Sequence, residues 1–293
     1  MATEDIPMTT HSPMAVLRPL DQARLNQDTM TPVRVLAAVP VWIPFALFFL
    51  CALWPSLALA QSGEAVRPFH ALWRWAPFLI TKGFLFNILI SFLCLIIGTG
   101  VGVLLGLCQI SLLRPVRRIS WFITQLFRNS PWLVILFIVM LALPFEVTIF
   151  GKAYFVPAWI KAVVGLSLPI MANISEIVRG AIRSVPNTQW EAAEALAFTR
   201  QQTMWRIILP QCFKRMIPPW MNWYAILTMA TPLVSILGVE EVMNLTRQAI
   251  VAEENRPELL MPFYGFVLLL FFAYCYPIAR LTLRLERKFA VKL

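Results

Sequence analysis

Five long stretches of this chain are apolar and free of charged residues, and their length constrains the fold more than any other feature. A hydrocarbon core about 30 Å thick is crossed by about 20 apolar residues in an α-helix. A sixth stretch, 153–175, carries Lys161 but is rich in small residues, which is typical of a helix packed against other helices. We therefore predict an all-α polytopic membrane protein whose charge-free stretches are 35–60, 84–113, 129–145 (beginning a turn earlier, near Trp121), 216–239 and 259–279.

The composition agrees with this fold class and excludes others. Hydrophobic residues make up 59% of the 293 residues and charged residues 14%, whereas soluble domains are about a quarter charged. The net charge of +10 is then explained by Lys and Arg in cytoplasmic loops, without nucleic acid as a partner. The cysteines show no paired spacing, and His11 and His70 stand alone, so neither disulfides nor a metal site is predicted.

The distribution of Lys and Arg also predicts the orientation. Six helices with both termini in the cytoplasm place most of the basic residues on the cytoplasmic side. The predicted parts are a cytoplasmic segment 1–34, an additional transmembrane helix 35–60, an extracytoplasmic connection 61–82 and a main domain 83–293. A signal peptide cleaved near Ala60 is the alternative for the first helix, but its apolar run is longer than the roughly 7–15 residues of a signal-peptide core.

A short polar segment, 186–211, separates two apolar stretches and carries a spaced motif. It consists of a Glu-Ala-Ala triplet, a small residue four positions on and an Ile-x-Leu-Pro ending, at Glu191, Ala192, Ala193, Ala197, Ile207, Leu209 and Pro210. The pattern resembles the EAA loop of ABC-importer permeases, in which relatives carry Gly at the position of Ala197. The alternative is an ordinary amphipathic surface helix, because Ala and Glu are common helix formers.

The resemblance implies that this segment forms a short cytoplasmic helix that docks into a cleft of an ATPase subunit. The residues that it assigns to ATPase coupling are Glu191, Ala192, Ala193, Ala197, Leu209 and Pro210. We expect the small side chains to let the helix backbone seat closely in the cleft. Because Ala is about 1 kcal/mol better than Gly inside a helix, we also expect Ala197 to be helical, with the turn near residues 199–201.

Further segments make the resemblance more specific. Over residues 82–293 the chain is similar to permeases of polar amino acid importers, the group for histidine, glutamine, glutamate, arginine and opines. The resemblance implies a five-helix type I importer core, to which the helix 35–60 is an addition. The segments that carry it are Gly83 with Asn87 and Ser91, 126–131 (LFRNSP), 176–191 beginning at Glu176, and 236–241 (ILGVEE).

The function implied is that of a transmembrane permease subunit of an ATP-driven importer in a bacterial inner membrane, working by alternating access on a polar amino acid. The chain has no G-x-x-x-x-G-K-[ST] phosphate loop, so it is not predicted to be an enzyme or to hold a cofactor, and a partner ATPase dimer would bind ATP and Mg. The other implied partners are a second permease subunit (identical or homologous), an extracytoplasmic solute-binding protein and membrane lipid. The alternatives are an importer of an opine or other modified amino acid, and a secondary transporter, which would need ionisable residues near the membrane midplane.

Two charged positions have candidate roles. Glu176 and Arg179 lie three apart on one helix face, and we expect them to pair and to support the EAA loop. Arg128 has two interpretations, a functional charge or a side chain that extends to the membrane interface.

The substrate pathway is predicted from polar residues in the first shared helix and in the stretch 216–239. Relatives carry an acidic residue and a Lys-Asp pair where this chain has Trp223 and Met229-Ala230. A polar solute would then meet mostly aromatic, hydroxyl and amide groups from this subunit. The candidate pathway residues are Asn87, Ser91, Asn222, Thr228, Thr231 and Ser235.

Overall fold

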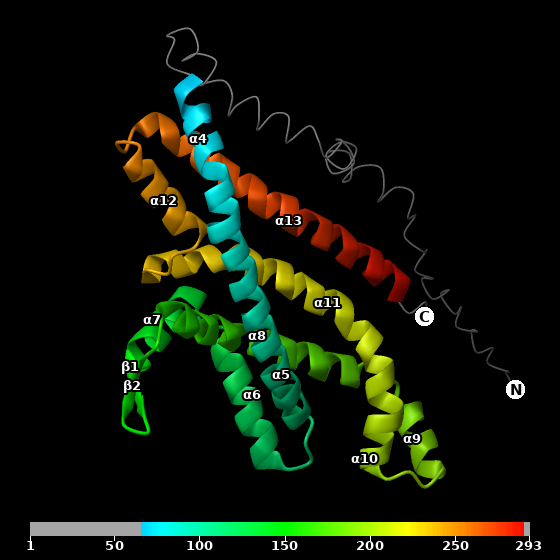
Figure 1. The fold of residues 1–293 in the computed structure, drawn as a ribbon. Coiled ribbons are helices and arrows are strands. Elements are labelled where there is room, and N and C mark those ends of the chain that lie inside the picture. The colour runs from blue at the N-terminus through cyan, green and yellow to red at the C-terminus, as the bar shows by residue number, and fades with distance from the viewer. Residues whose placement is uncertain (1–65, 290–293) are drawn as a thin grey trace, which may run out of the picture. The chain divides into compact units, whose positions relative to one another are not determined.

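Almost all of the described part of the chain is helical (Figure 1). The computed structural model describes residues 66–289, so the predicted helix 35–60 lies outside the described residues. Four continuous helical runs are long and apolar enough to cross a membrane, or five if α6 and α7 form one bent span. The elements are α4 (Val66–Phe78), the π-helical η1 (Leu79–Phe84), α5 (Leu85–Gln109), α6 (Arg114–Arg128), α7 (Trp132–Ala142), β1 (Glu146–Ile149), β2 (Lys152–Phe155), α8 (Ala158–Arg183), α9 (Asn187–Ala195), α10 (Arg200–Thr203), the π-helical η2 (Met204–Ile208), α11 (Leu209–Ala230), the 3₁₀-helical η3 (Thr231–Leu237), α12 (Val242–Ala252), the 3₁₀-helical η4 (Pro257–Leu259) and α13 (Leu260–Phe289).

Helices α5 and α8 pack against each other through a stripe of glycines. Gly98, Gly102 and Gly106 lie four residues apart, so they share one face of α5. A Cβ atom at Gly98 would lie 2.6 Å from Ile170, and one at Gly102 would lie 2.7 Å from the Met171 carbonyl oxygen. Residue numbers rise together along the two helices, so they run in the same direction. The missing side chains therefore allow the close approach that membrane helices obtain from small residues.

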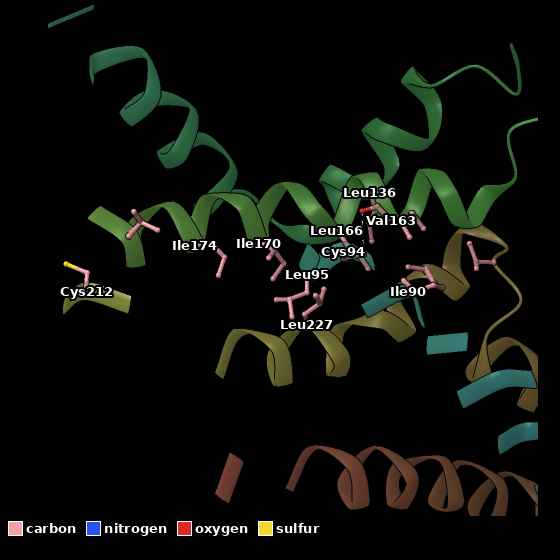
Figure 2. Close-up of a cluster of buried hydrophobic side chains, with 14 of the residues drawn as sticks. Ile90, Cys94, Leu95, Leu136, Val163, Leu166, Ile170, Ile174, Cys212 and Leu227 are labelled. Atoms are coloured by element: carbon pink, nitrogen blue, oxygen red, sulfur yellow. Dashed lines mark hydrogen bonds between the residues drawn. The ribbon is translucent and has the colours of Figure 1, made fainter. Parts of the chain in front are cut away.

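Helix α8 is the centre of the hydrophobic core. In its most apolar 18-residue window 72% of the residues are buried, which confirms that this small-residue-rich helix packs against helices rather than lipid. Figure 2 shows Leu166 and Ile170 of α8 beside Leu95 of α5 and Leu227 of α11. Helices α6 and α7 also contact α8. Any displacement of α8 would therefore also displace the helices that pack against it.

The predicted single span ending at residue 145 is instead broken into α6 and α7. The two helices meet at an angle of 106°. Pro131 has no N–H group, and it disfavours helical backbone at the residue before it, so the helix stops at Arg128. Ser130 and Asn129 donate side-chain hydrogen bonds to the carbonyl groups of Leu126 and Gln125 in the last turn of α6, and the Gln125 carbonyl group also accepts from the Asn129 backbone amide. The break is thus stabilised locally.

A two-stranded hairpin, which the all-α prediction did not include, follows α7. Strands β1 and β2 pair antiparallel, with Glu146 opposite Phe155 and Ile149 opposite Lys152. The turn residues Phe150 and Gly151 both have positive φ, as the favoured two-residue hairpin turns require. The segment is too short and too polar for a membrane span, so a search for apolar runs passes over it.

Lys161, the one charged residue of the predicted stretch 153–175, is fully buried near the start of α8. Its ammonium donates to the Leu143 carbonyl oxygen at 3.0 Å and lies 3.5 Å from the centre of the Phe145 ring. A cation at a helix C-terminus interacts favourably with the unpaired carbonyl groups there. Lys161 therefore anchors the end of α7 to α8.

The predicted helix 216–239 also has a different form. Helix α11 begins earlier, at Leu209, and changes into the 3₁₀ segment η3, which Gly238 ends with a φ of 78°. A further helix, α12, follows, with the Glu241 side chain as its N-cap. Helix α12 contains Asn, Thr, Arg and Gln, so its hydropathy does not mark it as a span.

Helix α4 is held to the end of α12 by Glu253. Its carboxylate accepts a hydrogen bond from Trp75 Nε1 at 2.8 Å and forms ion pairs with Arg74 and Arg256. The hydrogen bond from Trp75 and the positive charge of Arg74 lower the pKa of Glu253. The carboxylate is therefore charged at neutral pH, and the contact is present there.

The glycine stripe predicts a position-dependent effect of adding one methyl group. We expect Gly102→Ala to lower the thermal midpoint of the detergent-solubilised protein, because the new Cβ meets the α8 backbone and overpacking costs about 1–3 kcal/mol. Gly100→Ala is the matched control, since its Cβ would meet nothing within 4 Å. Equal midpoints for the two variants would contradict close packing at Gly102.

Candidate functional site

The segment 186–211 forms a helical loop between α8 and α11 (Figure 1). Pro186 precedes α9, where its fixed φ and missing N–H suit a helix start. The loop is tied to α11 by side chains, because Gln211 donates to Gln189 at 2.7 Å and Arg215 donates to the Ser184 hydroxyl at 2.8 Å. Both ends of the loop are thus attached to long helices.

Ala197 does not continue the helix, which corrects our expectation. Its φ is 55°, in the left-handed region. The Phe198 amide donates to the Ala193 carbonyl oxygen and the Ala197 amide to that of Glu194, the pair of bonds that defines a Schellman C-cap. The turn therefore comes earlier than residues 199–201. Gly in relatives at this position is explained by the positive φ, which helix propensity did not reveal.

The second half of the loop begins with a capping box and contains a π-helical turn. The Thr199 hydroxyl accepts from the Gln202 amide, and the Gln202 side chain accepts from the Thr199 amide. The π-helical η2 precedes Leu209 and Pro210, which stand at the start of α11. Pro210 cannot donate the helical bond to the Arg206 carbonyl group, so the helix is locally widened.

The side chains of the triplet face two ways. Ala193 is buried, so its small side chain serves the packing of the loop on the permease itself. Glu191 and Ala192 are exposed, as is Leu196, which is 71% exposed. An open cavity of about 530 Å³ lies beside them, lined by Asn187, Trp190, Glu194, Phe198, Arg200 and Thr203. The surface available to a partner therefore comprises Glu191, Ala192 and Leu196 rather than Ala193.

A charged cluster of Arg128, Glu176 and Arg179 joins the end of α6 to α8. Glu176 pairs with Arg179, as predicted, and its carboxylate also lies 3.6 Å from the Arg128 guanidinium. The neighbouring residue Ser175 belongs to a buried polar group with Gln109 of α5 and Thr124 of α6. Sequence reasoning had not connected Arg128 with Glu176, because the two residues are far apart in the chain.

The structure brings together only two of the candidate pathway residues. Asn87 and Thr231 are both fully buried and hydrogen-bonded to each other at 2.9 Å. Glu241, which was not among the candidates, joins them, although it belongs to the ILGVEE segment. Ser91, Thr228 and Ser235 donate to carbonyl groups of their own helices, and Asn222 is exposed.

Trp223, where the family resemblance leads one to expect an acidic residue, makes an aromatic contact. Its ring stacks on that of Trp132, the first residue of α7, with the ring centres 6.3 Å apart and an angle of 23° between the ring planes. The substitution thus links α11 to the helix that follows the break at Pro131. Within residues 66–289, no group of three or more His, Cys, Asp or Glu side chains is placed to hold a metal ion.

Comparison with known proteins defines the class. Residues 98–290 match the family "Binding-protein-dependent transport system inner membrane component". The arginine transport system permease protein ArtQ of Bacillus subtilis (strain 168) is 35% identical, over 67% of this chain and 89% of that protein. A putative glutamine transport system permease protein, GlnP of Rickettsia bellii (strain RML369-C), is 33% identical, over 60% and 79%. The crystal structure of an amino acid ABC transporter with histidines superposes with a TM-score of 0.64 at 23% identity, covering 75% of this chain and 98% of that one.

The chain therefore belongs to the inner-membrane components of binding-protein-dependent transport systems. It is a multi-pass permease subunit of an ABC amino acid importer and not the ATPase. Membership in this family implies an ATPase and a binding protein as partners.

The backbone at Ala197 predicts opposite effects for two glycine substitutions in the same loop. Ala197→Gly removes a left-handed alanine, which costs about 1–2 kcal/mol, and should slow amide exchange in residues 187–198 roughly tenfold. Ala192 lies inside α9, where Gly is about 1 kcal/mol worse than Ala. Ala192→Gly should therefore make amide exchange in residues 187–198 faster. Hydrogen exchange measured by mass spectrometry separates the two. Faster exchange in both variants would show that Ala197 is helical in solution.

Proposed function

We propose that the chain carries a polar amino acid across the inner membrane by alternating access, and that the loop 186–211 receives the ATPase. The observation that carries this proposal is the attachment of the loop. Helix α8 leads into α9, and α9 is bonded to α11 through Gln189 and Gln211. A push on α9 by an ATPase would therefore move two core helices together.

The exposed apolar side chain on the loop supports the docking role. Leu196 lies beside the left-handed turn at Ala197 and is 71% exposed, although a leucine in contact with water gains nothing for folding. The adjacent cavity, with Trp190 and Arg200 in its lining, would accept side chains of a partner. The ATPase is the partner that the family supplies, and two ATPases would serve two permease subunits, identical or homologous.

The Arg128–Glu176–Arg179 cluster supports the loop in this proposal. Glu176 is only 14% exposed, and two guanidinium groups balance its charge. It lies seven residues before the end of α8, about 10 Å along the helix axis. The cluster thus fixes the end of α6 to the part of α8 that moves with the loop.

The solute is proposed from the relatives and from the polar lining. Relatives are described as arginine, glutamine and L-cystine permeases, so a polar amino acid is the proposed solute class. An opine or another modified amino acid is the second candidate, because Trp223, Met229 and Ala230 replace charged residues of relatives with uncharged ones. Identification of the solute held by the partner binding protein decides between the two.

Docking through Leu196 predicts a specific loss of ATPase association. Leu196→Arg should weaken the affinity of the permease for its ATPase about tenfold, because a charge replaces an apolar anchor at the interface. Leu112→Arg, in the α5–α6 connection, is the matched control, since Leu112 is 67% exposed and lies at the same end of the core. Affinity is measured with the purified ATPase, and solute-stimulated ATP hydrolysis follows on the assembled complex. Equal affinities for both variants would refute docking at Leu196.

A further inference from the structure

Asn87 is the centre of a buried hydrogen-bonded cluster that joins three elements far apart in the chain. Its amide nitrogen donates to Thr231 Oγ1 at 2.9 Å and to Glu241 Oε2 at 2.7 Å. Its amide oxygen accepts from the Val242 backbone amide at 3.1 Å. Asn87 lies on α5, Thr231 begins η3 and Glu241 caps α12. We call these three side chains the Asn87 cluster.

Every polar atom in the Asn87 cluster has a partner. The second Glu241 oxygen accepts from the backbone amides of Met243 and Asn244, and the Thr231 hydroxyl donates to the Thr228 carbonyl oxygen. All three side chains are fully buried. Both amide hydrogens of Asn87 and the hydroxyl hydrogen of Thr231 are used within the protein, so the buried cluster has no hydrogen-bond donor left for a solute. The cluster therefore serves to fix helices rather than to bind.

The elements that the cluster holds need such support. The 3₁₀ segment η3 has seven residues, whereas 3₁₀ runs longer than three or four are uncommon. It begins at Thr231, where α11 changes its helical form, and ends at the left-handed Gly238. The Asn87 cluster thus holds the point at which α11 changes into a 3₁₀-helix and the point at which α12 starts.

The cluster also lies at the end of the core opposite the loop. Asn87 and Gln109 are 22 residues apart on α5, about 33 Å along the helix. Gln109 bonds to Ser175, near the end of α8 that leads into the loop, so Asn87 is at the far end. Because α5 packs on α8 through the glycine stripe, a movement of the loop reaches Asn87 through two closely packed helices.

We propose that Asn87 is a positioning residue of the transport cycle, which couples the movement of α5 and α8 to η3 and α12 at the end of the core remote from the ATPase. The proposal rests on the importer function of the family but not on the identity of the solute. It reassigns Asn87 and Thr231 from solute contact to helix positioning. Contacts that hold one arrangement of the helices resist displacement, so breaking them should let the ATPase cycle without solute.

An exchange of polarity tests this proposal in the assembled permease–ATPase complex in nanodiscs. Asn87→Asp alone places two carboxylates together, and Glu241→Gln alone places two amide NH₂ groups together. In the double variant the new amide at position 241 donates to the new carboxylate at position 87. That carboxylate still accepts from Val242, and the amide oxygen at position 241 still caps α12. The Thr231 hydroxyl, which accepts from Asn87 in the native protein, can turn to donate to the carboxylate instead. Each single variant should raise amide exchange in residues 231–252 roughly tenfold, and the double variant should restore it.

The rate of ATP hydrolysis is the second measurement, because loss of local structure alone would not raise it. The single variants should raise the maximal solute-independent rate severalfold with an unchanged KM for ATP, and the double variant should return it to the native rate. Ser167→Ala is the matched control, because Ser167 of α8 is also buried but its hydroxyl bonds only to the Val164 carbonyl oxygen of its own helix. It should leave both measurements unchanged.

The outcomes separate the proposal from the function on which it rests. A double variant no better than the worse single variant, an unchanged rate in the single variants, or a Ser167→Ala effect as large as that of Asn87→Asp would overturn the positioning role. Uptake of L-arginine, L-glutamine and L-cystine by native proteoliposomes tests the solute class separately. If the native complex imports none of them, the solute assignment fails while the exchange and ATPase results still judge Asn87.

Discussion

The close packing of α5 on α8 is the contact on which the rest of the structure depends. In a bilayer the helices gain little from leaving an apolar solvent, so surface fit decides which of them associate. The glycine stripe provides that fit, since side chains at Gly98, Gly102 or Gly106 would collide with α8. We therefore expect the two helices to move together as one rigid unit. Helix α8 leads into the loop 186–211, and α5 carries Asn87.

Polar side chains lie at both ends of the α5–α8 pair, and each set is buried by the helices that meet there. Gln109, Thr124 and Ser175 meet at the loop end, and the Asn87 cluster lies at the other. A buried polar group without a partner is costly in an apolar environment, so such groups define a unique arrangement of the helices that supply them. The apolar contacts between these ends are non-directional, whereas the hydrogen-bonded polar sets have discrete partners. An alternating-access protein needs both properties.

The breaks in the helices have local chemical causes and occur where the chain changes direction. Pro131 separates α6 from α7, and Pro210 coincides with the π-helical turn before α11. Gly238 supplies a left-handed residue where one is needed, and Ala197 adopts the same conformation without being glycine. The loop 186–211 therefore carries a small backbone strain at Ala197, which a glycine there would remove.

The sequence by itself determined the membrane class, most of the spans and the family, because apolar length and spaced motifs are local properties. It also determined the Glu176–Arg179 pair, which lies within one turn of helix. Only the tertiary structure decided that the span at 129–145 is bent, that Lys161 is buried and that Ala197 is left-handed. It also joined Asn87 to Glu241, 154 residues away along the chain. The physical reason is that backbone conformation at a turn and the partner of a buried polar group are set by the packing of distant helices, which hydropathy and helix propensity do not encode.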